Sequence, residues 1–104
     1  MQVSPLFYLQ RRVKEMTVDE FASLFWLPNI EIEANDHVFN FDKQLSPFAD
    51  HVRKLYYTES FNTFFYYVFN LFEAFKNFVL NLEDKDIAVY KGKYYVIIPF
   101  KHKE

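Results

Sequence analysis

The clearest alternation of apolar and polar positions runs from Ser60 to Leu82. Apolar residues recur there at spacings of four and three, which predicts an amphipathic helix over residues 61–82. Such a helix would be about 33 Å long, enough to cross a bilayer. Glu73, Lys76 and several asparagines interrupt it, so a membrane-spanning segment is not predicted. The predicted core-facing positions are Phe61, Phe64, Phe65, Val68, Phe72, Phe75, Val79 and Leu82.

Three shorter helices are predicted before the long one. They cover residues 6–16, 18–26 and 47–57. Thr17 and Glu20 have the spacing of a capping box at the start of the second helix, and Pro28 ends it. Ser46 and Pro47 are typical of the N-cap and first position of a helix, which places the start of the third.

Two β-hairpins complete the predicted fold. Apolar residues alternate with glutamates over 30–34, and a turn at 35–37 leads to a partner strand that ends at residue 41. In the second hairpin, residues 87–100, Gly92 supplies the positive φ that a tight turn needs. We therefore expect an α+β fold with about four helices and two hairpins, at about 30–41 and 87–100, in a single domain of residues 1–104. Two helices precede each hairpin.

The predicted elements carry more apolar surface than one small body needs. Apolar residues extend past both shoulders of the core-facing stripe of the long helix, over an arc of about 200°. The last strand is apolar on both faces, and such strands are covered on both faces. Since large exposed apolar patches mark interaction sites, we predict contact with another chain. The alternative is that all these residues are interior. The predicted interface residues are Tyr67, Phe69, Leu71, Phe78, Leu80, Tyr95 and Ile97.

Composition strengthens this prediction and removes several function classes. The chain of 104 residues has 14 Phe and 8 Tyr but a single Gly, which excludes glycine-rich phosphate loops. It has no Cys, so disulfides and thiolate metal sites are excluded. The formal net charge is −2. The basic residues form two small groups, which we interpret as solvated surface, so no direct nucleic-acid contact is expected. These groups are Arg11, Arg12 and Lys14, and Lys91, Lys93, Lys101 and Lys103.

The polar residues give no catalytic, cofactor or metal signature. His37 and His51 each follow an aspartate, and a metal site would need three or four such ligands to converge. The acidic residues Glu83, Asp84 and Asp86 lack the spacing and central glycine of a calcium loop. We therefore expect no enzyme and no cofactor. An enzyme would require His37, His51 and Asp50 to converge in a pocket.

Two resemblances bear on function. The Phe- and Tyr-rich, Gly-poor texture of FNTFFYYVFNLFEAFKNFVLN resembles that of small proteins encoded in ciliate mitochondrial genomes. That resemblance implies a subunit of a respiratory complex or a mitoribosome, and the near-neutral charge favours the respiratory complex. Separately, YYVFNLFEAFKNFVLNLEDKDIAVYKGKYYVIIPF is similar in pattern to the C-terminal domain of MecA-type Clp adaptors, over a third of the chain. Its first part is predicted to be helix here instead of strand.

These observations predict a non-catalytic accessory subunit of a large multi-subunit complex, most simply a mitochondrial respiratory complex. Its partners would be other protein subunits, and it could lie peripheral to a membrane without spanning it. Residues 1–15 have no uninterrupted apolar region of the kind found in signal peptides. We expect a location in the mitochondrial matrix or on the matrix side of the inner membrane, with the cytoplasm as the alternative. The alternative functions are a free-standing protein-binding adaptor or inhibitor and a mitoribosomal protein.

Overall fold

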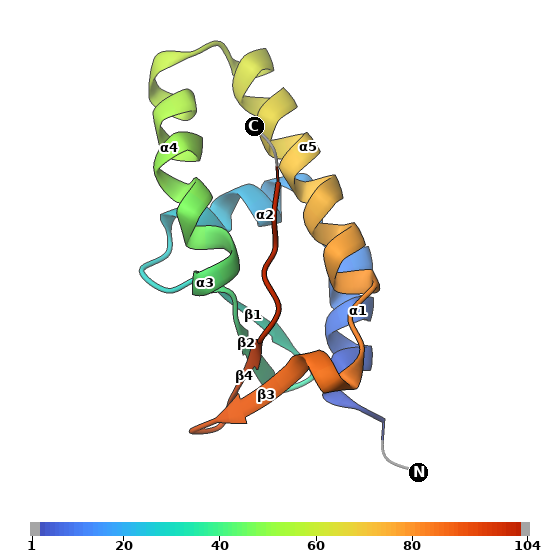
Figure 1. Cartoon of the computed structure of the whole chain (residues 1–104). Coiled ribbons are helices and arrows are strands. Elements are labelled where there is room, and N and C mark those ends of the chain that lie inside the picture. The colour runs from blue at the N-terminus through green and yellow to red at the C-terminus, as the bar shows by residue number, and fades with distance from the viewer. Residues whose placement is uncertain (1–2, 103–104) are drawn as a thin grey trace.

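The computed structural model describes residues 3–102 and places helices above a four-stranded sheet (Figure 1). The helices are α1 (Pro5–Glu15), α2 (Val18–Ser23), α3 (Asp42–Leu45), α4 (Ala49–Thr58) and α5 (Phe61–Leu80), with 3-10 turns η1 (Leu24–Trp26), η2 (Ser46–Phe48) and η3 (Asp84–Asp86). The strands are β1 (Glu31–Ala34), β2 (His37–Asn40), β3 (Ile87–Tyr90) and β4 (Lys93–Val96). The predicted α+β fold with two hairpins is confirmed.

The two hairpins join into one sheet of order β1-β2-β4-β3. Each hairpin is antiparallel, and β2 pairs with β4 in parallel, a connection the sequence pattern did not predict. Both turns have two residues at positive φ. These are Asn35 (49°) and Asp36 (65°) in the first and Lys91 (47°) and Gly92 (80°) in the second. Such turns match the twist of the strands they connect. The first turn is thus one residue shorter than predicted, and His37 belongs to β2.

Phenylalanines from distant elements form the centre of the core. The Phe21 ring of α2 lies 4.8 Å from that of Phe72 and 5.5 Å from that of Phe75, both on α5. The Phe41 ring meets Phe75 edge-on at 5.0 Å. Phe21, Phe41 and Phe75 are all fully buried, and α1 contributes Leu9 to the same cluster. One continuous core therefore links the sheet, α1, α2 and α5.

The third predicted helix begins earlier and less regularly than predicted. The helical region starts at Asp42 as α3, passes through η2 and continues as α4 to Thr58. Ser46 is already the first residue of η2, whose N-cap is Leu45, so the assignment of Ser46 as the N-cap is wrong. The start is fixed instead by Asp42, whose carboxylate accepts from the Ile30 backbone N–H at 2.6 Å. The Asn40 side chain accepts from the Asp42 N–H at 3.0 Å.

The last strand is shorter than predicted, because β4 ends at Val96. Residues 97–102 leave the sheet and run upward between α4 and α5 (Figure 1). The buried Gln44 side chain donates to the Val96 carbonyl at 2.8 Å and to the Ile98 carbonyl at 3.1 Å. Further along, the Phe100 ring packs against Phe78 at 5.2 Å. This segment therefore covers part of α5 that the helical wheel left open.

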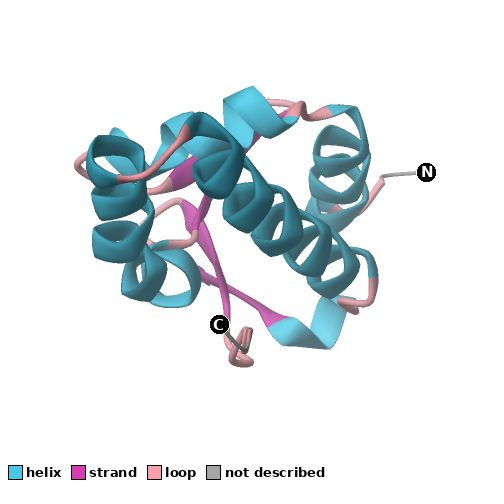
Figure 2. Cartoon of the chain, turned by 90° about the horizontal axis from the view of Figure 1, so that it is seen from above, coloured by secondary structure: helices cyan, strands magenta, loops and turns pink. Residues whose placement is uncertain are grey.

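The described body is elongated, with principal extents of 48 × 24 × 23 Å. Seen from above, the helices overlie the strands (Figure 2). α4 and α5 form an antiparallel pair whose connection lies at the upper end, farthest from the sheet (Figure 1). Within residues 3–102, no helix is both long and apolar enough to cross a membrane.

Candidate functional site

The long helix buries most, but not all, of its predicted core-facing stripe. Phe64, Val68, Phe72, Phe75 and Val79 are buried, as is Leu82 just beyond the helix. Phe61 and Phe65 are 70% and 37% exposed, so their prediction as core residues is wrong. The reason is the position of α2, whose Phe21 meets α5 at Phe72 and Phe75, about three turns below Phe61. At the upper end of the stripe, rings from η1 and α4 cover Phe64 but leave Phe61 and Phe65 exposed.

The predicted interface residues separate into covered and exposed ones. Leu71 is fully buried, so its placement on an exposed shoulder is wrong. Tyr67 and Phe78 are partly buried against the core. These residues are covered by segments distant in the sequence, which the helical periodicity of α5 could not predict. The His51 ring of α4 lies 4.7 Å from that of Tyr67, and Phe100 covers Phe78. The exposed members are Phe69 (43%), Leu80 (37%) and Ile97 (58%), while Tyr95 is half-buried.

A different group of exposed rings lies at the upper end of the described chain. We call it the aromatic face, and it consists of Trp26, Tyr56, Tyr57, Phe61, Phe65 and Phe69. Their exposed fractions run from 37% to 72%. Three elements supply them: η1 gives Trp26, the last turns of α4 give the tyrosines, and α5 gives the phenylalanines at intervals of one helical turn.

Ring contacts join the residues of the aromatic face into two groups. On α5 the Phe65 ring lies 5.8 Å from Phe61 and 6.1 Å from Phe69. Tyr56 meets Trp26 at 5.3 Å and Tyr57 at 5.1 Å, both edge to face. A groove of about 450 Å³ separates the two groups, and its lining includes Trp26, Tyr56, Tyr57, Phe61 and the buried Phe64. The face is therefore one hollowed surface with aromatic walls.

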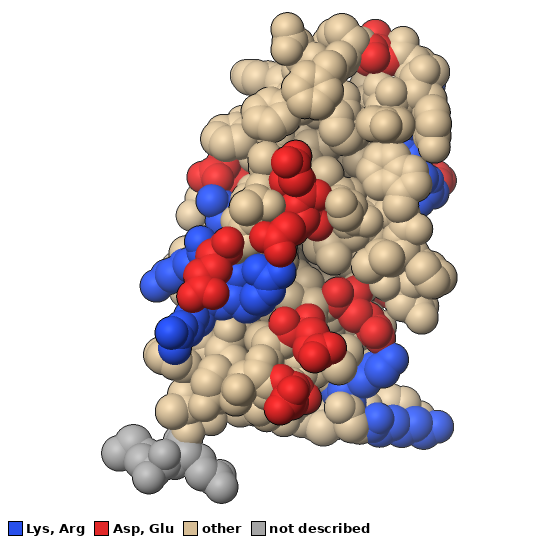
Figure 3. Space-filling model, turned by 180° about the vertical axis from the view of Figure 1, so that it is seen from behind, with Lys and Arg blue, Asp and Glu red and all other residues tan. Residues whose placement is uncertain are grey.

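The aromatic face is nearly free of charge. Between Tyr56 and Phe72 the only charged residue is Glu59. In the view from behind, the upper end is almost entirely uncharged, whereas acidic and basic side chains gather lower down (Figure 3). Many of those lower charges are paired, including Arg12 with Glu20 at 2.8 Å and Lys93 with Glu31 at 2.6 Å. The hydrogen bond to Glu31 raises the pKa of Lys93.

The area of the aromatic face can be compared with known interfaces. The six exposed fractions together equal about three whole aromatic side chains. At 150–250 Å² for each aromatic side chain, this is roughly 600 Å². The largest apolar patch on an ordinary monomer is about 300–600 Å², and a standard interface covers about 800 Å² of each partner. The aromatic face thus provides most of the surface of one side of an interface.

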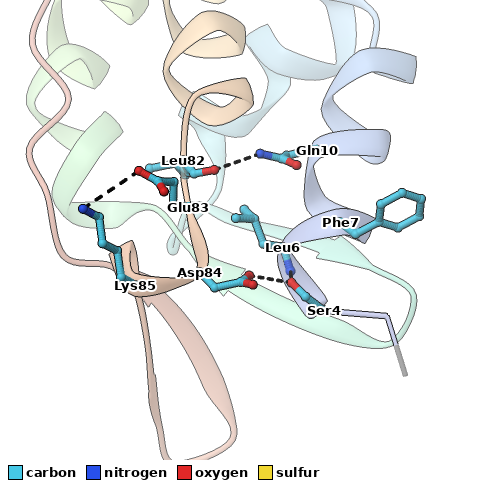
Figure 4. Close-up of a pocket in the computed structure, with 8 residues that line it drawn as sticks. All are labelled: Ser4, Leu6, Phe7, Gln10, Leu82, Glu83, Asp84 and Lys85. Atoms are coloured by element: carbon cyan, nitrogen blue, oxygen red, sulfur yellow. Dashed lines mark hydrogen bonds and ion pairs between the residues drawn. The ribbon is translucent and has the colours of Figure 1, made fainter. Parts of the chain in front are cut away.

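A second hollow, at the lower end, has a structural explanation (Figure 4). It lies between the start of α1 and the segment after α5. The Gln10 side-chain amide donates there to the carbonyls of Val79 (3.1 Å) and Leu82 (3.2 Å), which are left over at the end of α5. The Ser4 hydroxyl donates to the Asp84 carboxylate at 2.7 Å. These polar groups hold α1 against α5, so the hollow carries no candidate chemistry.

The histidines lie apart, in separate elements. His37 in β2 stacks on Tyr8 at 5.9 Å and meets Tyr94 edge to face at 5.5 Å, whereas His51 in α4 packs against Tyr67. Asp50 pairs with Arg53 at 2.5 Å. No group of three or more His, Cys, Asp or Glu side chains within residues 3–102 is arranged to hold a metal ion. Lys103, counted with the second basic group, lies outside the described residues.

Sequence reasoning found only Phe69 of the six residues in the aromatic face. The helical periodicity assigned Phe61 and Phe65 to the core. Trp26, Tyr56 and Tyr57 lie at helix ends, where periodicity carries little information. One signal was present: residues 56–72 contain a single charge and nine Phe or Tyr close to a predicted chain reversal. Such a run of aromatic residues beside a helix–helix connection is unusual, because connections normally lie in water.

Comparison with known proteins gives no family for this chain: no protein-family model, curated protein or solved structure matches it. The proposals below therefore depend on the geometry of the chain itself.

Proposed function

We propose that the protein is a non-catalytic accessory subunit that docks onto a larger protein assembly through its aromatic face. The supporting observation is that six rings stay exposed although the core is complete without them. Phe21, Phe41 and Phe75 already join the sheet to α2 and α5. Burying an exposed aromatic side chain is worth roughly 2–3 kcal/mol, so an external surface that covers these rings would gain substantial free energy.

A protein partner fits this face better than a membrane surface. Trp and Tyr are also enriched at membrane interfaces. Helices that lie on membranes, however, combine their apolar face with Lys and Arg, which attract anionic lipids. The charged residues that border the aromatic face on α2 and in the α4–α5 connection are Asp19 and Glu59. Acidic borders would be repelled by such a membrane.

The identity of the assembly is a narrower proposal. A mitochondrial respiratory complex is supported by the compositional resemblance to small ciliate mitochondrial proteins, and a mitoribosome is less favoured because the net charge is −2. A free-standing adaptor remains the second candidate, and the continuous core favours it, because such a chain would be stable alone. The purified protein separates the two. An obligate subunit should aggregate or bind a hydrophobic dye, whereas an adaptor should remain a monomer.

The central experiment compares partner capture by three tagged versions of the protein in its native cells: wild type, Phe61→Asp and Val89→Asp. Phe61 is the first residue of α5, where an aspartate interacts favourably with the helix dipole, so the variant should fold. Val89, in β3, is 62% exposed against 70% for Phe61, and therefore receives the same new charge at a similar exposure away from the aromatic face. We expect Phe61→Asp to reduce capture about tenfold or more, as for a central interface residue.

The control sets the meaning of the result. Val89→Asp should capture the partner as wild type does, and circular dichroism should give the same helix content for all three proteins. Equal capture by Phe61→Asp and wild type would refute docking through the aromatic face. Partner-free binding of wild type, but not Phe61→Asp, to phosphatidylserine vesicles would instead identify a membrane as the occupant.

A further inference from the structure

We propose that the groove in the aromatic face accepts a cationic side chain of the partner, an arginine above all, over its rings and beside Asp19. This inference rests on the proposed function and specifies the chemistry of the docking segment. Three observations carry it: the arrangement of the rings, the charge at the rim, and the engagement of the nearby Arg53 by other groups.

The first observation is a corner formed by three rings. Trp26, Tyr56 and Phe64 are inclined to one another by 66–77°, with centroids 5.3–6.5 Å apart. Phe64 is buried and forms the base, while Trp26 is 39% and Tyr56 55% exposed. Aromatic faces carry negative electrostatic potential, and cations bind within about 6 Å of a ring centroid, with tryptophan the strongest partner. The guanidinium of arginine also stacks on such faces.

The second observation is the charge of Asp19. It is the only charged residue that lines the groove in the described part of the chain. Its neighbour Glu20 pairs with Arg12, but Asp19 makes no ion pair within residues 3–102. The lining thus combines electron-rich rings with one uncompensated carboxylate. This combination is complementary to a cation and unfavourable for an acidic segment.

The third observation is that the nearby cation of the chain is engaged elsewhere. Arg53 lies one helical turn before Tyr56 on α4. Its guanidinium donates to the Phe25 carbonyl at 2.7 Å and to Asp50 at 2.5 Å. The groove, at about 450 Å³, lies within the size range of ligand pockets. It therefore has room for a long side chain, and no Lys or Arg within residues 3–102 lines it.

Asp19 has another role, which the test must separate from binding. It is the second residue of α2, where a carboxylate stabilises the helix dipole. Substitution could thus lower stability without touching recognition. The decisive quantity is therefore the preference for a charged over a neutral ligand of the same shape, because a change in stability does not alter that ratio.

The probes are two acetylated, amidated seven-residue peptides, Leu-Pro-Pro-x-Pro-Pro-Leu, in which x is arginine or citrulline. Citrulline has the shape of arginine without its charge, and proline-rich segments dock into aromatic grooves in an extended form that needs little ordering. Trp26 is the only tryptophan, so its fluorescence reports on the groove directly. Titrations would use wild type, Asp19→Asn and Tyr56→Leu, each at low and high salt.

We expect the arginine peptide to bind wild type about fivefold more tightly than the citrulline peptide at low salt. Asp19→Asn should reduce this preference to about twofold, and Tyr56→Leu should reduce it further while weakening both peptides. High salt should weaken the arginine peptide alone. Equal binding of the two peptides, or no Trp26 response to either up to about 5 mM, overturns the inference. Loss of partner capture in Phe61→Asp would then still support the proposed function, whereas unchanged capture would refute that function whatever the peptides do.

Discussion

The lower end of the molecule pairs its backbone polar groups with side chains, whereas the upper end leaves aromatic rings exposed. At the lower end, side-chain amides complete backbone hydrogen bonding where a regular element stops. Gln10 donates to the carbonyls of Val79 and Leu82 at the end of α5, and Gln44 donates to those of Val96 and Ile98 at the end of β4. At the upper end, Tyr56 of α4 meets Phe64 of α5 ring to ring at 5.3 Å, and the six rings of the aromatic face remain in contact with solvent.

This difference separates residues that hold the fold from residues that are available for binding. Burial and paired polar groups at the lower end and in the middle stabilise the folded chain relative to the unfolded one. The exposed rings at the upper end change their environment much less on folding. Their free energy of burial is therefore still available to a docking partner.

The largest expected effect comes from making the same substitution at a buried and at an exposed phenylalanine of α5. Phe75 is fully buried and contacts Phe21, Phe41 and Phe100, so Phe75→Ala should lower the free energy of unfolding by about 3–5 kcal/mol. Phe61 is 70% exposed, and Phe61→Ala should change the free energy of unfolding by no more than about 0.5 kcal/mol. Urea denaturation of both variants measures the difference. Similar losses would mean that the exposed rings hold the fold, which removes the main support for docking.

A smaller effect is expected from the amide that ends the sheet. Gln44→Met keeps the length of the side chain but removes the donor to the Val96 and Ile98 carbonyls. Leaving a buried carbonyl without a partner costs about 1–3 kcal/mol, and we expect a loss near 2 kcal/mol because Ile98 is partly exposed. Lys43→Met is the matched control, since Lys43 is the exposed neighbour on α3. A loss no larger than that of the control would show that this hydrogen bonding contributes nothing to stability.

The sequence was sufficient where the signal is local. The Thr17–Glu20 capping box is present with both hydrogen bonds, at 3.1 and 2.9 Å, and Gly92 occupies the predicted positive-φ position. The order of helices and hairpins also follows the predicted pattern. Each of these features depends on residues within a few positions of one another, which a periodicity or a spacing can specify.

The sequence was insufficient where distant segments meet. Leu71 is buried because α4 and the segment 97–102 cover its side of α5, and no helical wheel contains that information. The parallel pairing of β2 with β4 is likewise a tertiary contact. For the same reason the aromatic face was misplaced. Whether Phe61 is covered depends on where α2 ends in space, about three turns away along α5.

The smallest expected effect tests the capping box as a source of stability at the molecular surface. The hydrogen bond from the Thr17 backbone N–H, followed by that from Arg12, lowers the pKa of Glu20 below its ordinary value of 4.5. A carboxylate whose pKa is lowered in the folded state stabilises the protein above its unfolded pKa, and this contribution is lost as the pH falls through the folded value. Glu20→Gln preserves the capping geometry but does not titrate. The stability advantage of wild type over Glu20→Gln should therefore be present at pH 6 and shrink between about pH 4.5 and pH 3.

Carbon-13 NMR of the Glu20 carboxyl group gives the folded pKa directly, and urea denaturation across that pH range gives the linked stability. Arg12→Gln refines the assignment, because Arg12 is the lesser cause. In that variant the pKa of Glu20 should rise toward 4.5 but stay below it, since the Thr17 N–H is still present. An ordinary pKa for Glu20 in wild type would mean that the capping box is too weakly populated in solution to stabilise α2. The position of Phe21 against Phe72 and Phe75 would then be held by core packing alone.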